Sequence, residues 1–227
     1  MSKNHRSFYR GSSAYRRGVP RFPPSGKAFL IVTEGEKTEP NYMDALRKRL
    51  QLNATDVKIV HPPGTDPVTL TKHAIALRDA RKKSAEKSYT VLPYDEVWVI
   101  FDLEKEHDQR RELAKRAMRL EEAAGIQFAI SDPCFEYWLL LHHDYTTRPF
   151  PECDAVIKLL NKHMPGYSKG MKPESSIFDK LPAAVRHAMR CRKHHETSGG
   201  NGNPSTKVDF LVANLNAATR PHLRFPL

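Results

Sequence analysis

Carboxylate side chains follow three short apolar runs of this chain, at the point where each run ends. They are Glu34 after residues 28–33, Asp102 and Glu104 after residues 96–101, and Asp132 and Glu136 after residues 126–131. Short apolar runs of this kind are typical of buried strands. If the strands are parallel, their carboxyl ends share one edge of the sheet, where α/β proteins bind ligands. Carboxylates gathered there repel one another unless a hard cation lies between them, so the pattern predicts a metal site.

The carboxylates differ in how directly the sequence supports a role for each. Glu34 is the strongest candidate, because Gly35 permits a tight turn that projects the preceding side chain over the sheet edge. Asp102 and Glu104 are two residues apart, so in an extended backbone they point the same way and can share a cation. Glu136 lies in an otherwise apolar helical segment, where a lone acid should be paired, hydrogen-bonded or metal-bound. We favour a functional Glu136 over a structural ion pair.

Other ionisable residues near these carboxylates have simpler explanations. Glu36 and Glu39 are expected to interact with the positive end of the helix that follows them, and His142 and His143 with the negative end of theirs. Lys37 is a candidate to offset negative charge on a bound phosphate, with an exposed surface lysine as the alternative.

Two other kinds of site are less well supported. Cys191, His194 and His195 fall at positions i, i+3 and i+4 of a basic helix and could bind zinc, but no second ligand pair has finger-like spacing. The chain contains neither a P-loop nor a G-x-G-x-x-G word, so any ATP should be bound by a partner. Cys134, Cys153 and Cys191 are odd in number and lack close pairing, which argues against a disulfide framework.

The charge of the chain points to a polyanionic partner. The 227 residues carry a formal net charge of +11, and the sequence pI is near 9.6, which favours nucleic acid over acidic proteins. Residues 1–26 are basic, free of acids and interleaved with aromatic residues, so they are expected to form a flexible arm that either lies along phosphates or remains a solvated tail. No stretch approaches the length of a membrane span and no signal peptide is visible, so a cytoplasmic protein without membrane contact is expected.

Alternating strand and helix patterns over residues 27–143 would position the carboxylates. A first-turn proline at Pro40 opens one helix, and apolar stripes predict two more, at residues 70–80 and 113–124. The alternation predicts right-handed βαβ units, hence an α/β core with a mainly parallel sheet flanked by helices. Residues 144–227 read as a helical extension packed on this core, with a flexible loop at 198–204 and a final helix whose buried face contains Val208, Leu211, Val212 and Leu215.

The chain also resembles RloB-like proteins in four short segments. These are residues 34–42 (Glu-Gly-Glu-Lys-Thr-Glu-Pro-Asn-Tyr), 101–102 (Phe-Asp), 132–138 (Asp-Pro-Cys-Phe-Glu-Tyr-Trp) and 203–206 (Asn-Pro-Ser-Thr). The resemblance implies a Toprim-like core in which Glu34 and Asp102 match the family's acidic residues. Glu104 stands where a second aspartate is expected, and Asp132 where many relatives have asparagine. The resemblance also implies a role in antiphage defence, including abortive infection, beside an AAA-type ATPase partner.

Together these observations predict a nuclease that uses Mg²⁺, or Mn²⁺ in its place, to hydrolyse phosphodiester bonds of DNA or RNA, with tRNA among the candidate substrates. Asp102 and Glu104 would ligate the metal, Glu136 or Asp132 would help to hold a second ion, and Glu34 would act as a ligand or as a general acid–base. The alternative is a non-catalytic nucleic-acid-binding or adaptor subunit that keeps the Toprim-like fold.

Overall fold

The computed structural model describes residues 26–227 except residues 55, 65, 89, 104–106 and 200–201. The arm predicted for residues 1–26 lies outside this part of the chain apart from its last residue. Within the described residues one five-stranded sheet has the order β2-β1-β3-β4-β5. Its strands are β1 (Phe29–Thr33), β2 (Val57–Val60), β3 (Glu96–Asp102), β4 (Gln127–Asp132) and β5 (Ser205–Thr206). The first four pair in parallel, and β5 runs antiparallel to β4.

Helices alternate with the parallel strands and then continue to the end of the chain. The helices are α1 (Thr38–Arg49), α2 (Pro67–Lys87), α3 (His107–Ala124), α4 (Glu136–Leu141), α5 (Cys153–His163), α6 (Leu181–Ser198) and α7 (Val208–Ala218), with 3-10 turns η1 (Ser175–Lys180) and η2 (Pro221–Leu223). The predicted fold class, a mainly parallel α/β sheet flanked by helices, is confirmed. None of the described helices is long and apolar enough to cross a membrane.

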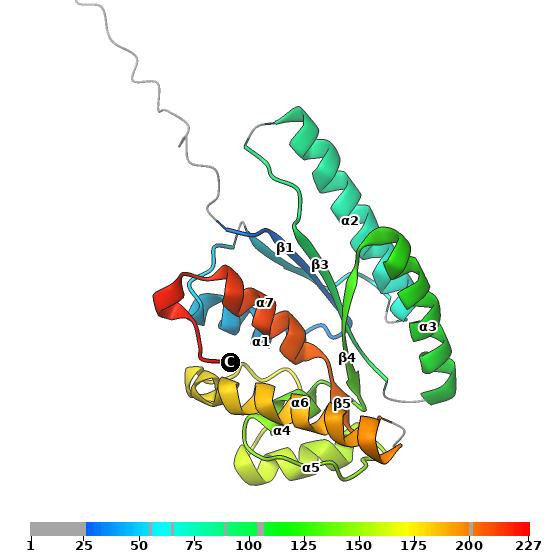
Figure 1. The fold of residues 1–227 in the computed structure, drawn as a ribbon, viewed down its shortest axis with the longest axis vertical. Helices are drawn as coiled ribbons and strands as arrows, with labels where there is room; N and C mark the ends of the chain where they lie inside the picture. The colour runs from blue at the N-terminus through cyan, green and yellow to red at the C-terminus, as the bar shows by residue number, and fades with distance from the viewer. Residues whose placement is uncertain (1–25, 55, 65, 89, 104–106, 200–201) are drawn as a thin grey trace, which may run out of the picture.

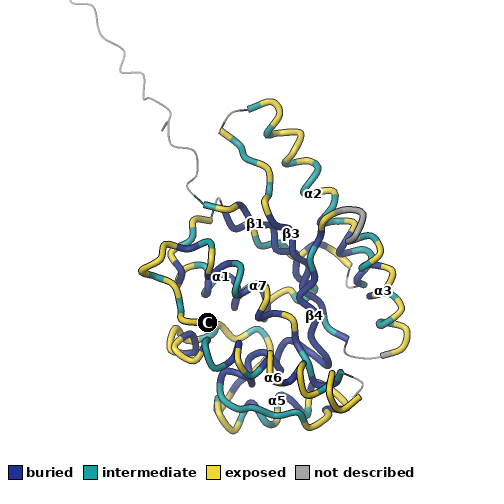
Figure 2. Tube along the Cα trace, viewed as in Figure 1, coloured by how far each residue is buried: buried dark blue, intermediate teal, exposed yellow. Residues whose placement is uncertain are grey.

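Two hydrophobic clusters lie on opposite faces of the sheet, because successive strand residues point to opposite sides. Leu30 and Val32 of β1 pack with buried residues of α2 and α3. Ile31, between them, packs with α1 and with the helices that follow β4. The central strands β1, β3 and β4 are therefore almost entirely buried between helices (Figures 1 and 2). The four residues predicted for the buried face of the final helix are all fully buried in α7.

Three details of the fold differ from the expectations. Among the described side chains of α3, Ala114 and Ala117 are buried and Leu113 is only half-buried, so the buried face keeps Ala117 of the predicted stripe but includes Ala114 in place of Leu113. The short strand β5 was not predicted, because two residues are too few to show a period. Asn203, which was assigned to a flexible loop, is buried, and its side-chain amide bonds both the backbone N–H and the carbonyl of Phe150 at 2.9 Å.

Candidate functional site

The neighbouring strands β1 and β3 end side by side, and their acidic residues meet there. The backbone N–H of Glu34 donates to the carbonyl of Ile100 at 2.9 Å, which continues the β1–β3 ladder by one residue. The Glu34 side chain then turns back, and its Oε2 accepts the backbone N–H of Asp102 at 3.0 Å. Glu136 enters from the start of α4, just after β4. Parallel strands thus bring residues that are far apart in the sequence to one edge of the sheet.

A cavity of about 350 Å³ lies at this edge. Of the predicted site residues, Glu34, Lys37, Asp102 and Glu136 line it. Glu104 lies outside the described residues. The structure therefore brings together three of the predicted carboxylates and the predicted lysine.

The carboxylate of Asp102 is only partly hydrogen-bonded by the described residues. Its Oδ2 accepts the backbone N–H of Phe135 at 3.0 Å. Its Oδ1 is buried and has no hydrogen-bond partner among the described residues. Burial, followed by the negative charges of Glu39, Glu34 and Glu136, holds the pKa of Asp102 well above its usual range. Such an oxygen is stabilised by a proton, by a hydrogen-bond donor such as water, or by a cation.

Glu34 is fixed by an arginine that the sequence reasoning missed. Arg110, in the first turns of α3, donates from Nη2 to Glu34 Oε1 at 2.6 Å and from Nε to the carbonyl of Asp102 at 2.9 Å. A basic residue in the helix directly after an acidic strand end was the available signal. Arg110 thereby orients Glu34 and brings positive charge to the carboxylates.

Glu39 also lines the cavity, as does the exposed Glu36, and the assignment of Glu39 to the helix dipole alone was incomplete. It lies in the first turn of α1, but its side chain is buried and Oε1 accepts the backbone N–H of Gly35 at 3.2 Å. Burial, with smaller contributions from Glu136 and Glu34, raises the pKa of Glu39 to about 7. Its charge therefore changes near neutral pH.

Gly35 leaves room for the Glu39 carboxylate. A Cβ at Gly35 would lie 1.9 Å from Oε2 and 2.5 Å from Cδ of Glu39. Its backbone is not among the positive-φ residues, so the requirement for glycine here is one of space and not of conformation.

We expect Gly35→Ala to displace the Glu39 carboxylate from the cavity and to weaken divalent-cation binding at least about tenfold, the loss expected when a carboxylate that supports a metal is removed. Gly35→Ala/Glu39→Ala should bind no more weakly than Glu39→Ala alone, because the clash is then gone. Isothermal titration with Mg²⁺ and Mn²⁺ measures both effects. Additive losses in the double variant would contradict the steric explanation.

Asp132 is placed away from the cavity. Its buried carboxylate bonds Arg111 Nη2 at 2.5 Å through Oδ2 and the Asn203 amide at 2.9 Å through Oδ1. Asp132 is not one of the residues that line the cavity. These contacts tie β4 to α3 and to the segment before β5, which accounts for its burial without a metal.

Two exposed lysines flank the carboxylates. Lys37 precedes α1, and Lys169 belongs to the segment between α5 and η1. That segment is held against α1, because the N–H of Gly170 donates to Thr38 Oγ1 at 2.9 Å and the amide of Asn41 donates to the carbonyl of Gly170 at 2.8 Å. Lys169 could not be found from the sequence, since it is remote from every acidic segment.

A comparison with protein-family models agrees with the family resemblance of the four short sequence segments. The family model described as RloB-like protein matches residues 29–215. The chain belongs to the RloB-like family. The match spans all five carboxylates that line the cavity, Glu34, Glu36, Glu39, Asp102 and Glu136. No curated protein matches the chain.

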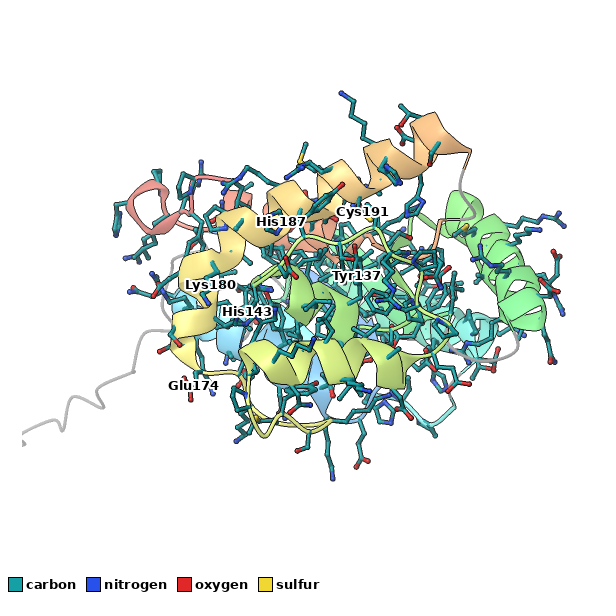
Figure 3. All side chains as sticks on the ribbon, turned by 90° about the horizontal axis from the view of Figure 1, so that it is seen from below. Tyr137, His143, Glu174, Lys180, His187 and Cys191 are labelled. Atoms are coloured by element: carbon teal, nitrogen blue, oxygen red, sulfur yellow. A yellow bond between two sulfur atoms is a disulfide. The ribbon has the colours of Figure 1, made fainter. Side chains whose placement is uncertain are left out.

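The zinc alternative on α6 of this RloB-like chain is not supported by its geometry. Cys191 Sγ lies 2.9 Å from the carbonyl of Pro204, His195 Nε2 also lies 2.9 Å from it, and His187 Nδ1 lies 2.8 Å from the carbonyl of Leu141. Cys191 is also 3.1 Å from the hydroxyl of Tyr137 (Figure 3). These side chains satisfy backbone carbonyls, and the metal-ligating groups found among the described residues do not include them.

Two further expectations for this chain are corrected by the structure. His142 is buried between Tyr42 and the carbonyl of Trp138, and burial lowers its pKa to about 3, so it is neutral and does not act as a cation at the helix end. Cys134 and Cys153 form a disulfide, contrary to the expectation from their spacing. The packing of α4 against α5 brings the two cysteines together, and their spacing in the sequence did not indicate this pairing.

Proposed function

We propose that the chain is a Mg²⁺-dependent nuclease, with Mn²⁺ able to replace Mg²⁺. The observation that carries the proposal is the buried Oδ1 of Asp102, which has no partner among the described residues and lies in a cavity with four other carboxylates. Burial, and then the charges of the neighbouring carboxylates, raise the pKa values of Asp102 and Glu39, so their ionised forms are unfavourable in the folded protein. An all-oxygen set of this kind suits a hard divalent cation.

Asp102 and Glu136 are the proposed ligands, with Glu104 as a further ligand and Glu34 either as a ligand or as a general acid–base. When bound, Mg²⁺ would polarise the phosphate and lower the pKa of a coordinated water. Arg110 holds Glu34 in position through its guanidinium. Glu39 can hold or release a proton near neutral pH, because its pKa is about 7. Lys37 and Lys169 would offset charge on the phosphate at the mouth of the cavity.

The proposed substrate is DNA or RNA, with tRNA among the candidates, and the net charge of +11 supports a polyanionic partner. By resemblance to RloB-like proteins, we further propose a Toprim-type core, a cytoplasmic role in antiphage defence, and control by an AAA-type ATPase partner. Membership of the family supports these proposals.

One observation favours the second candidate, a nucleic-acid-binding or adaptor subunit without catalysis. The 2.6 Å ion pair between Arg110 and Glu34 supplies positive charge to the carboxylates from the protein itself. Glu104 and Asp132 also depart from the residues that the family resemblance leads one to expect.

Metal binding and cleavage distinguish the two candidates. Mg²⁺ titration of the full chain should show binding that competes with protons, and a panel of single-stranded DNA, double-stranded DNA and tRNA should be cut only with Mg²⁺ or Mn²⁺ present. Nucleic-acid binding without divalent-cation binding would support the adaptor and contradict the nuclease.

A further inference from the structure

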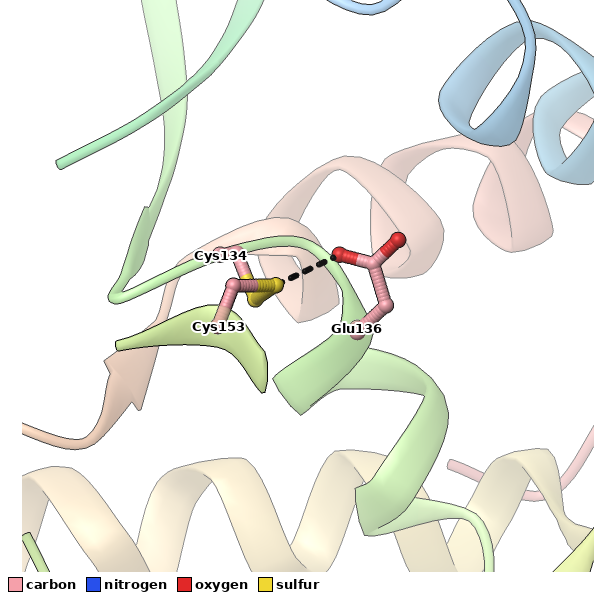
Figure 4. Close-up of side chains that lie close together, drawn as sticks. All are labelled: Cys134, Glu136 and Cys153. Carbon is pink, nitrogen blue, oxygen red and sulfur yellow. Dashed lines mark hydrogen bonds between the residues drawn. A yellow bond between two sulfur atoms is a disulfide. The ribbon is translucent and has the colours of Figure 1, made fainter. Parts of the chain in front are cut away.

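Beside the proposed Mg²⁺ site, two sulfur atoms and one carboxylate lie close together. Cys134 precedes α4, Glu136 begins α4, and Cys153 begins α5 (Figure 4). All three side chains are buried, and one ligand atom from each lies within 4.8 Å of the other two. The Sγ of Cys153 is 3.2 Å from Glu136 Oε2. While the disulfide is intact Cys153 has no hydrogen to donate, so this distance marks a close contact.

Reduction would change what these residues can bind. A cellular dithiol supplies two electrons and two protons, the Cys134–Cys153 bond breaks, two thiols form, and the reductant becomes a disulfide. Two cysteine sulfurs and a carboxylate oxygen are ligands that Zn²⁺ accepts, whereas Mg²⁺ prefers an all-oxygen set. Glu136 also lines the cavity, so the two sulfurs lie next to it.

We propose that the reduced chain binds Zn²⁺ through the thiolates of Cys134 and Cys153 and the carboxylate of Glu136, and that the disulfide form does not. Binding releases the two thiol protons to solvent. Three protein ligands leave the site short of the four that closed zinc sites have, so the ion should exchange.

A consequence of this site rests on the proposed nuclease function. With Oε2, which faces Cys153, bound to Zn²⁺ and Oε1 accepting the Tyr167 hydroxyl at 3.1 Å, both oxygens of Glu136 would be engaged away from Mg²⁺. Zn²⁺ held by the sulfurs would therefore withdraw Glu136 from the Mg²⁺ set and repress cleavage.

Co²⁺ is a suitable probe, because thiolate coordination gives a charge-transfer band in the near ultraviolet that oxygen ligands do not give. We expect the anaerobically reduced full chain to show this band, saturating at one ion per chain, and Zn²⁺ to abolish it. Cys134→Ser and Cys153→Ser should lose the band, and Glu136→Gln should need more Co²⁺. Cys191→Ser and Asp102→Asn should retain it, since Cys191 lies elsewhere and Asp102 belongs only to the oxygen site.

The parent chain can also be compared before and after reoxidation of its disulfide. This comparison needs no substitution, so the result does not depend on whether a variant folds. The absence of the band in the reduced chain, its persistence after reoxidation, or its loss in Cys191→Ser would overturn the zinc site. If no metal or substrate gives cleavage, the proposed nuclease fails while the cobalt result still decides the sulfur site. A band together with cleavage that is insensitive to Zn²⁺ would overturn the repression.

Discussion

Asp102→Asn is expected to reduce metal-dependent cleavage by more than about 100-fold, corresponding to roughly 3 kcal/mol of lost transition-state stabilisation. Asparagine keeps an oxygen that can accept the N–H of Phe135, so the start of α4 should remain in place. It removes the charge of the carboxylate whose Oδ1 has no partner among the described residues. The loss would therefore reflect metal binding and not a damaged fold.

The same variant should be as stable as the parent, or more stable, in metal-free buffer at pH 8. The raised pKa of Asp102 means that its charged form is disfavoured by burial and by the neighbouring carboxylates. Thermal melting and cleavage assays on the same preparations measure the two effects. Asp144→Asn is the matched control, because this half-exposed aspartate does not line the cavity. A variant that still cuts nucleic acid, or melts well below the parent, would contradict the assignment.

The second large effect concerns pH. Asp102 and Glu39 both have folded pKa values above their usual ones, that of Glu39 being about 7. Between the unfolded and folded pKa values of these carboxyls, the folded chain binds more protons than the unfolded chain. The contribution of the protonated carboxyls to the free energy of unfolding is therefore complete below about pH 4 and is lost as pH rises through about 7. From Glu39 alone the loss is on the order of 3 kcal/mol, since each pKa unit corresponds to about 1.4 kcal/mol.

Denaturant unfolding with a chelator present, at pH values from 5 to 8, gives the free energy of unfolding of the parent and of Asp102→Asn/Glu39→Gln. The free energy of unfolding of the parent minus that of the variant should fall as pH rises, so that the parent is the more stable at low pH and the variant at high pH. Adding Mg²⁺ should stabilise the parent more at pH 8 than at pH 5.5, because protons compete with the cation for the carboxylates. A difference curve that is flat, or an equal effect of Mg²⁺ at both pH values, would refute the carboxylate cluster.

The order of strands and helices could be predicted because it depends on local pattern. Each parallel strand is buried on both faces and therefore appears as a short apolar run, and each covering helix shows an apolar stripe. Once the sheet was predicted to be parallel, the meeting of Glu34, Asp102 and Glu136 at its carboxyl edge followed from topology. β5 was beyond prediction, because two residues that pair with a distant strand carry no period.

The sequence by itself determined the fold class, the family and three carboxylates of the candidate site. Tertiary structure alone decided which acids remain without a compensating partner. Asp132 and Asp102 both end strands of the sheet, yet Arg111 and Asn203 satisfy the first, while an oxygen of the second has no partner among the described residues. It also decided that Gly35 makes space for Glu39 and that Cys134 meets Cys153. Such contacts depend on distances between segments that the fold brings together, and the local sequence pattern does not predict them.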